Sequence, residues 1–186
     1  MAHLLVSRIS VAAVALLLCS PAIPANAPEA SVKLVLDVAG KGKVEITLAP
    51  DKAPKTCEHL VQLAQSGFYS GQKFIKAVKS PKPFLVQFGD PNSRTKPMDD
   101  PELGKTGSGK QIPYEDSGLP NVRGAVGLST LPKDRNSGDS IFYVSLAENR
   151  FLDGKYTVFG HVTKGIEVVD KVEVGDEVSS VTVVRG

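Results

Sequence analysis

The chain has few of the residues that carry metal-dependent or nucleophilic chemistry. Its 186 residues include three His, two Cys and no Trp. No segment has the paired His or Cys spacing of a metal site or the glycine motif of a phosphate-binding loop. Cys57 and His59 are two residues apart, so on a helix they would point to different faces and could not act as nucleophile and base. We therefore expect no metal and no cofactor.

An excess of charge of one sign is also missing. The chain has 22 Lys and Arg against 20 Asp and Glu, a formal net charge of +2, and only 6% aromatic residues. There is no basic block, so nothing in the composition favours binding to nucleic acid. The length suits one domain with a full hydrophobic core.

No apolar run of the N-terminal segment is long enough to cross a bilayer, which takes roughly 20 residues. Residues 11–18 are apolar, Arg8 is the only Lys or Arg in residues 1–27, and small residues follow at 25–27. This pattern is typical of a secretory signal peptide over residues 1–27. We therefore predict a periplasmic or secreted protein whose domain spans residues 28–186, with no stable membrane span after cleavage.

Two alternatives to cleavage stay open, an uncleaved membrane anchor and lipidation at Cys19. Leu18 stands where lipoprotein processing normally requires a small side chain. If Cys19 leaves with the signal peptide, Cys57 is the one remaining cysteine, and an intramolecular disulfide is impossible.

Apolar periodicity predicts many strands and two helices. Residues 54–64 and 165–172 have apolar side chains at helical spacing. Alternating or short apolar runs predict strands over residues 32–38, 44–48, 84–88, 125–128, 141–146, 157–162 and 178–184. This order favours an antiparallel barrel, closed or nearly closed, that is capped by helices. Residues 89–121 form a long loop, functional or mobile, with little apolar pattern.

Several motifs follow one another in the order typical of one enzyme family. They are Gly67-Phe68-Tyr69, Phe74-Ile75-Lys76, and residues 84–90, 123–129, 140–144 and 151–160. Together they resemble the cyclophilin-type peptidyl-prolyl cis-trans isomerases over essentially all of residues 31–186. The resemblance implies a mainly β fold, a closed eight-stranded antiparallel barrel capped by two α-helices, with peptide bound on its outer face.

The resemblance also implies a reaction, the cis-trans isomerisation of X-Pro bonds of exported proteins, which assists their folding. The barrier is about 20 kcal/mol because amide resonance is lost as the bond twists. An apolar pocket for the proline ring, a donor near the proline nitrogen and polar groups on the rotating carbonyl would lower it. The implied partners are proline-containing segments of unfolded or exported polypeptides, and we expect a monomer.

The resemblance assigns ten site residues. Lys76 and Gln87 occupy catalytic positions. The substrate-binding positions are those of Phe84, Leu85, Ser129, Ile141, Tyr143, Phe151, Leu152 and Tyr156.

Several of these residues depart from the family pattern. Lys76 stands where the family has its catalytic arginine, and a lysine ammonium lacks the planar fork of donors. We therefore expect turnover to be lower by about tenfold to several hundredfold. Ile141 replaces a usual glutamine, Phe151 a frequent Trp and Tyr156 a frequent His, while Ser129 replaces a small alanine.

These departures leave other interpretations open. The chain could be a binding module that holds proline-containing segments without accelerating isomerisation, or an interaction protein that uses the loop of residues 89–121. Individually, the proposed pocket residues could be ordinary strand residues, and Lys76 a solvated lysine.

Overall fold

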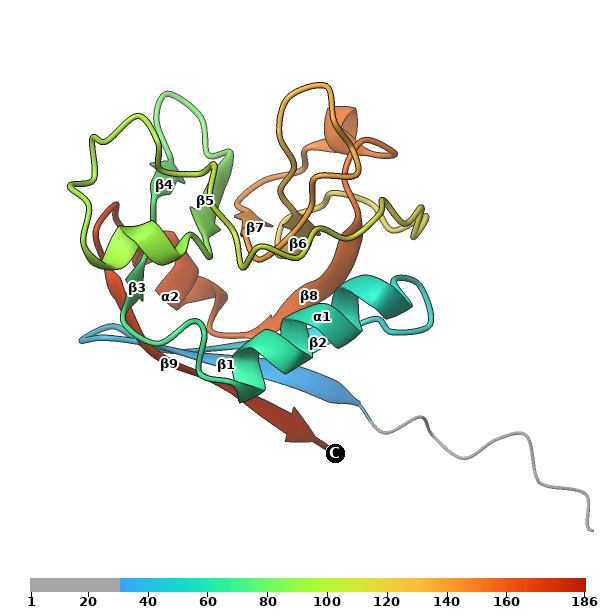
Figure 1. Cartoon of the computed structure of the whole chain (residues 1–186), viewed down its shortest axis with the longest axis horizontal. Coiled ribbons are helices and arrows are strands. Elements are labelled where there is room, and N and C mark those ends of the chain that lie inside the picture. Colours follow the sequence, from blue (N-terminus) through green and yellow to red (C-terminus); the bar gives the residue numbers. More distant parts are fainter. Residues whose placement is uncertain (1–30) are drawn as a thin grey trace, which may run out of the picture.

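The structure is a computed structural model, and it describes residues 31–186 (Figure 1). The predicted signal peptide and Cys19 lie outside the described residues. The C-terminus and the first described residues lie together beside the long helix. The hairpin loop between β4 and β5 and the loop after β6 extend from the opposite side of the molecule (Figure 1).

One antiparallel sheet of nine strands forms the body of the protein. Its strand order is β3-β9-β1-β2-β8-β6-β7-β5-β4. The strands are β1 (Val32–Val38), β2 (Gly42–Leu48), β3 (Gln72–Lys73), β4 (Lys76–Val78), β5 (Leu85–Phe88), β6 (Ala125–Leu128), β7 (Phe142–Ser145), β8 (Val158–Lys164) and β9 (Glu177–Arg185). All strands predicted from the sequence are present, with ends that differ by a few residues.

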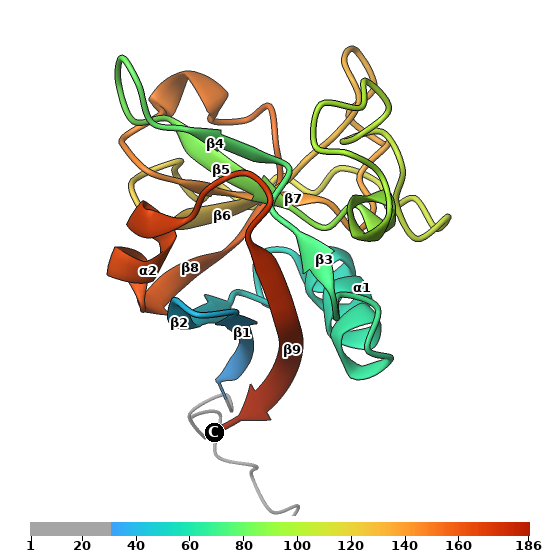
Figure 2. The ribbon, with the colours of Figure 1, turned by 90° about the vertical axis from the view of Figure 1, so that its left-hand side faces the viewer.

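The sheet curls strongly, but the closed eight-stranded barrel implied by the family is not confirmed. The two end strands, β3 and β4, follow each other in the chain and are not paired with each other. β3 pairs with β9, whereas β4 pairs with β5 (Figure 2). Between them the backbone N–H of Phe74 donates to Asp176 O, and that of Ile75 donates to Gln87 O. The segment of residues 72–78 thus pairs first with β9 and then with β5, so it forms two short strands, β3 and β4, and the sheet has nine strands.

Alternation along the strands separates core from surface. In β1, Leu34, Leu36 and Val38 are buried, and their neighbours are less so. Aromatic rings fill the centre: the ring centroids of Tyr69 and Phe88 lie 5.5 Å apart. Burial of one continuous apolar cluster, rather than a disulfide, stabilises the described domain, in which Cys57 is free and buried.

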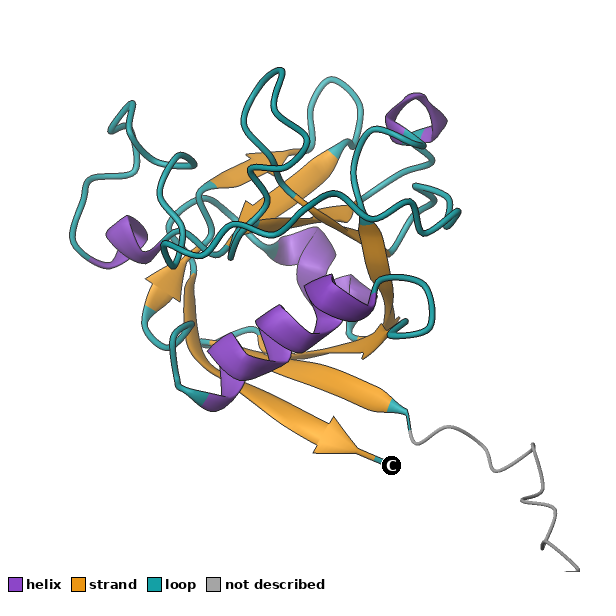
Figure 3. Cartoon of the chain, turned by 45° about the vertical axis from the view of Figure 1, so that its right-hand side comes forward, coloured by secondary structure: helices purple, strands orange, loops and turns teal. Residues whose placement is uncertain are grey.

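Two helices flank the curled sheet, as predicted. α1 (Pro54–Gln65) crosses one opening of the sheet, and α2 (Ile166–Lys171) lies beyond it in Figure 3. Proline suits the first turn of α1 because its missing N–H has no helical partner there. Gly165 precedes α2 with φ 81°, and a Cβ at this position would overlap the carbonyl oxygen of Lys43. Only glycine fits that junction.

The long loop of residues 89–121 is tied to the rest of the fold. It contains a 3₁₀ turn, η1 (Pro91–Arg94). The Glu115 carboxylate accepts hydrogen bonds from the backbone N–H of Lys55 at 3.0 Å and of Thr56 at 2.8 Å. It therefore caps α1, whose N-cap residue Ala53 has no side chain that could do so. The loop thus provides the N-terminal cap of α1.

A second tie anchors the middle of this loop. The Asp139 carboxylate accepts hydrogen bonds from Ser108 Oγ at 2.5 Å and from the backbone N–H of Gly109 at 2.9 Å. His59 Nε2 of α1 lies 3.2 Å from the same carboxylate. Burial raises the pKa of Asp139, but hydrogen bonds from His59, Ser108 and Gly109 outweigh it and lower the pKa below its usual value.

Candidate functional site

The site begins as a row of side chains across four neighbouring strands. Lys76 of β4 pairs with Gln87 of β5, Gln87 pairs with Tyr143 of β7, and Tyr143 pairs with Gly127 of β6. Directly opposed residues have their side chains on the same face of a sheet. Their neighbours in sequence, such as Val86, belong to the main core on the other face. The row therefore lies on the outer surface of the curled sheet.

A pocket of about 200 Å³ lies along this row. Its apolar part is a small cluster separate from the main core. The cluster consists of Leu85, Tyr143 and Leu152, with Phe84 and Tyr156 packed against them. Leu152 comes from a second 3₁₀ turn, η2 (Arg150–Leu152). The polar side of the pocket is formed by Lys76, Gln87, Ser129 and Thr130. A ligand in which an apolar ring adjoins an amide group would match this division into an apolar and a polar side.

Buried hydrogen bonds fix the floor of the pocket. Tyr143 Oη donates to Asn121 Oδ1 at 2.6 Å. Burial raises the pKa of the Tyr143 hydroxyl well above its usual value, so the group stays protonated and remains a donor. The backbone N–H of Asn121 and its Nδ2 both donate to Asp153 Oδ1, and these two bonds lower the pKa of Asp153. The aromatic ring is thereby held in one orientation.

Gly127 makes room for this ring. A methyl group at Gly127 would lie 2.7 Å from Tyr143 Cε1, and closer still to Cζ and Oη. Sequence reasoning missed Gly127, Asn121 and Thr130. A glycine inside a predicted strand does signal close approach of another group, and this signal could have identified Gly127. Nothing in the sequence marks Asn121.

The polar residues differ in how they are held. Gln87 Nε2 donates to Ser129 Oγ at 3.0 Å, which orients the amide along the edge of the pocket. Lys76 is exposed, and within residues 31–186 its ammonium makes no hydrogen bond or ion pair with another side chain. Its three donors are free for a ligand.

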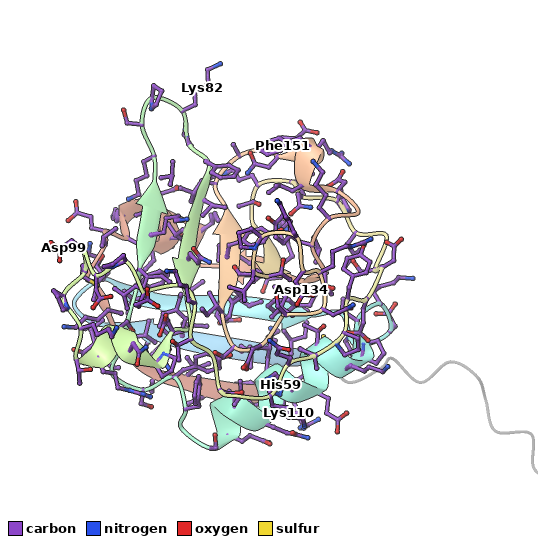
Figure 4. The ribbon with its side chains drawn as sticks, turned by 45° about the horizontal axis from the view of Figure 1, so that its top comes forward. His59, Lys82, Asp99, Lys110, Asp134 and Phe151 are labelled. Atoms are coloured by element: carbon purple, nitrogen blue, oxygen red, sulfur yellow. The ribbon has the colours of Figure 1, made fainter. Side chains whose placement is uncertain are left out.

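Eight of the ten predicted site residues line this pocket, and two do not. Phe151, labelled in Figure 4, lies at the surface. It is 60% exposed, and its ring stacks on Phe84 at the rim of the pocket, with centroids 5.8 Å apart. Ile141 lines an adjoining cavity of about 60 Å³ that shares Ser129 and Thr130 with the main pocket. The structure therefore places these two beside the pocket rather than in its wall.

Across residues 31–186, no three His, Cys, Asp or Glu side chains come close enough together to hold a metal ion. Within the same range, no helix has the length and apolar character needed to cross a membrane.

Comparisons with known proteins agree with this geometry. The family model "Cyclophilin type peptidyl-prolyl cis-trans isomerase/CLD" matches residues 33–185. A "probable peptidyl-prolyl cis-trans isomerase" of Brucella suis is 35% identical over 153 residues, which cover 81% of this chain and 74% of the relative. "Peptidyl-prolyl cis-trans isomerase A" of Dickeya dadantii is 33% identical over 171 residues, which cover 89% of this chain and 83% of the relative.

Solved structures show the same fold. A cyclophilin-type peptidyl-prolyl cis-trans isomerase of Cryptosporidium parvum superimposes with a TM-score of 0.70 at 21% identity, covering 83% of this chain and 99% of that one. The same protein in the presence of the dipeptide Ala-Pro gives a TM-score of 0.69 at 21% identity, with 84% and 99% covered.

Proposed function

The chain belongs to the cyclophilin-type peptidyl-prolyl cis-trans isomerase family, a family of isomerase enzymes, and on that basis we propose that it isomerises X-Pro bonds of exported proteins, with turnover lowered by Lys76. The observation that carries the proposal is the row of Lys76, Gln87 and Tyr143 beside an apolar pocket. A structural relative studied in the presence of Ala-Pro supports a proline-containing ligand.

The pocket offers what the reaction needs. The proline ring packs among Phe84, Leu85 and Tyr143, and burial of the ring fixes the segment on the enzyme. Gln87 lies at the edge, where its amide can hold the carbonyl that rotates. No bond is made or broken, so catalysis consists of binding the twisted amide more strongly than the planar one.

Lys76 supplies the positive charge at this site. A donor near the proline nitrogen favours its pyramidal form, in which amide resonance is lost. An ammonium does this as a mobile point charge on a flexible stem, whereas a guanidinium presents several donors in fixed directions. We infer a loss of about tenfold to several hundredfold relative to an arginine, equivalent to about 1.4 to 3.5 kcal/mol.

Export is the part of the proposal that rests on sequence alone. The apolar run of residues 11–18 and the small residues at 25–27 are typical of a cleaved signal peptide. The mass of the protein recovered from its native host tests this: loss of residues 1–27 supports export with cleavage, and an intact N-terminus contradicts it.

A second candidate function has one observation in its favour. Lys76 is exposed, and among the described residues no side chain forms an ion pair with its ammonium, so the site could bind proline-containing segments without stabilising the twisted state. In that case the protein is a binding module that protects such segments.

The two functions can be distinguished by comparing the wild type with Lys76→Arg and Lys76→Ala. The assay measures isomerisation without a coupling protease, on a peptide with uncharged residues around its proline. The proposal predicts turnover in the order Arg, Lys, Ala, with smaller changes in peptide affinity, because the contact strengthens mainly in the transition state. Lys43→Ala is the matched control, since Lys43 is also an exposed strand lysine but lies outside the pocket. Equal rates in all variants would make Lys76 a bystander, and binding with no rate in any would establish the binding module.

A further inference from the structure

A second cleft, of about 340 Å³, continues from the proline pocket. It is lined by residues 130–135 on one side and residues 154–156 on the other. Thr130 and Tyr156 belong to the walls of both the cleft and the pocket. A peptide whose proline occupies the pocket therefore has its flanking residues at or near this cleft, since an extended chain advances about 3.3 Å per residue.

The cleft carries an excess of positive charge. Lys133, Arg135 and Lys155 line it, against one acidic residue, Asp134. Within residues 31–186 none of the three basic side chains forms an ion pair. We call this surface, defined by Lys133, Arg135 and Lys155, the cationic cleft.

The acidic groups around the cleft are already engaged. The carboxylate of Asp134 accepts the backbone N–H of Asn136 at 2.9 Å and so closes its own turn. In the neighbouring cavity, Asp153 accepts from Asn121, and Asp116 accepts from the backbone N–H of Gly118. These donors are uncharged amides, so each carboxylate keeps its charge. Among the charged residues that line the cleft, three cations still outnumber the one anion, Asp134, which leaves an excess of two positive charges.

The two segments that carry these charges are tied to each other. The Arg135 guanidinium lies 3.6 Å from the ring centroid of Tyr114 and donates to Gly154 O at 2.8 Å. The Tyr114 hydroxyl donates to the same carbonyl oxygen at 3.1 Å. Lys133 has φ 68°, the left-handed conformation of a tight turn. The backbone segments on the two sides of the cleft are thus held together by hydrogen bonds to Gly154 O.

We propose that the cationic cleft binds acidic side chains that flank the proline of the substrate, so that the protein prefers X-Pro segments with Asp or Glu within about three residues of the proline. This inference rests on the proposed function, because it assigns a preference to the same site. Exposed charge pairs are weak individually and are screened by salt, so each acidic residue is expected to raise kcat/KM about two- to fivefold at low ionic strength.

The test compares three peptides that differ at one position, with Glu, Gln or Lys placed two residues before the proline, and a second set with the change two residues after it. Turnover is measured without a coupling protease, because a protease has its own sequence preference. We expect Glu to exceed Gln, and Gln to exceed Lys, in at least one set at about 20 mM salt. The difference should shrink at about 0.5 M salt, where the screening length is only a few ångströms.

Charge reversal locates the effect. Lys133→Glu combined with Lys155→Glu should abolish the order of the peptides or invert it, while the uncharged peptide keeps its rate within about twofold. Lys52→Glu combined with Lys110→Glu makes the same change in net charge away from the cleft. Lys110 lies beside α1, whereas Asp134 marks the loop of the cleft (Figure 4). This control should leave the preference intact.

Failure of the inference can be distinguished from failure of the proposed function. If the uncharged peptide is turned over but Glu, Gln and Lys peptides react equally, the cationic cleft has no role and isomerase activity stands. If no peptide is turned over, the proposed function fails, and the preference for acidic residues is then tested by the affinities of the same peptides. Tighter binding of the Glu peptide, lost in the Lys133/Lys155 variant, supports it, and equal affinities overturn it.

Discussion

Gly127→Ala should damage the floor of the pocket through a single methyl group. Gly127 lies in β6, beside an irregularity in the pairing with β8, but its φ is not positive, so an alanine meets no left-handed backbone strain there. The obstacle is Tyr143, whose Cε1 would be 2.7 Å from the added carbon, with Cζ and Oη closer. Carbon atoms in contact prefer about 3.5 to 4.0 Å. The ring must therefore move by about 1 Å or more.

This movement has two costs. Overpacking of a well-packed site costs about 1–3 kcal/mol. The displacement also takes Tyr143 Oη out of hydrogen-bonding range of Asn121 Oδ1, now 2.6 Å away, and a buried acceptor without its donor costs about 1–3 kcal/mol. Because the two effects overlap, we expect the free energy of unfolding to fall by about 2–4 kcal/mol. The displaced ring also enters the pocket, so kcat/KM should fall at least tenfold.

A double-mutant cycle in urea isolates the contact. In a Tyr143→Leu background the ring and its hydroxyl are gone, so Gly127→Ala should cost less than about 1 kcal/mol. The coupling between the two positions should therefore exceed about 1 kcal/mol. An equal cost in both backgrounds, or a Gly127→Ala protein with wild-type stability and turnover, would refute the reasoning.

Three further predictions concern other parts of the molecule. Glu115→Ala should lower the free energy of unfolding by about 2 kcal/mol in urea, because Thr56 and the start of α1 lose their cap; a loss below about 0.5 kcal/mol would show that the cap is not needed. The pKa of Asp139 is lowered in the folded protein, so its contribution to stability is present above about pH 4 and is lost as the pH falls through the folded pKa. As the pH is lowered from about 6 to about 2, the urea midpoint should therefore fall less steeply in Asp139→Asn than in the wild type. Parallel curves for the two proteins would contradict this. Phe84→Ala should weaken binding of a proline-containing peptide at least about fivefold in a variant that remains folded, since Phe84 forms one wall of the pocket and supports Phe151; unchanged affinity by titration would place the ring outside the binding site.

Local pattern predicts most of the elements here. α1 is visible in the sequence because four apolar residues recur at helical spacing after Pro54, and β1 because its residues alternate. β3 and β4 were missed, since runs of two and three residues have no periodicity and exist through pairing with distant strands. For the same reason the strand count of the sheet could not be derived from the sequence.

The residues of the site also fall into two groups, those that the sequence predicts and those that it does not. Family motifs identify Lys76, Gln87 and Tyr143, and the structure brings them into one row. Asn121 belongs to no motif, and its importance comes from a bond to a tyrosine that is 22 residues away in the chain. Glu115 caps a helix that begins about 60 residues earlier, a contact that no local pattern records. Contacts of this kind depend on the assembled fold.

The alternation of β5 has a consequence for how such a protein diversifies. Val86 and Phe88 belong to the main core, whereas Leu85 and Gln87, which alternate with them along the strand, line the pocket. Mutations at the outward positions can therefore alter which peptides are recognised while the interior is unchanged. Lys76 is such a position: it is exposed at the start of β4, so its replacement should cost little stability, whatever its effect on the proposed turnover. Selection on recognition and selection on stability thus act on alternate residues of the same short strand, β5.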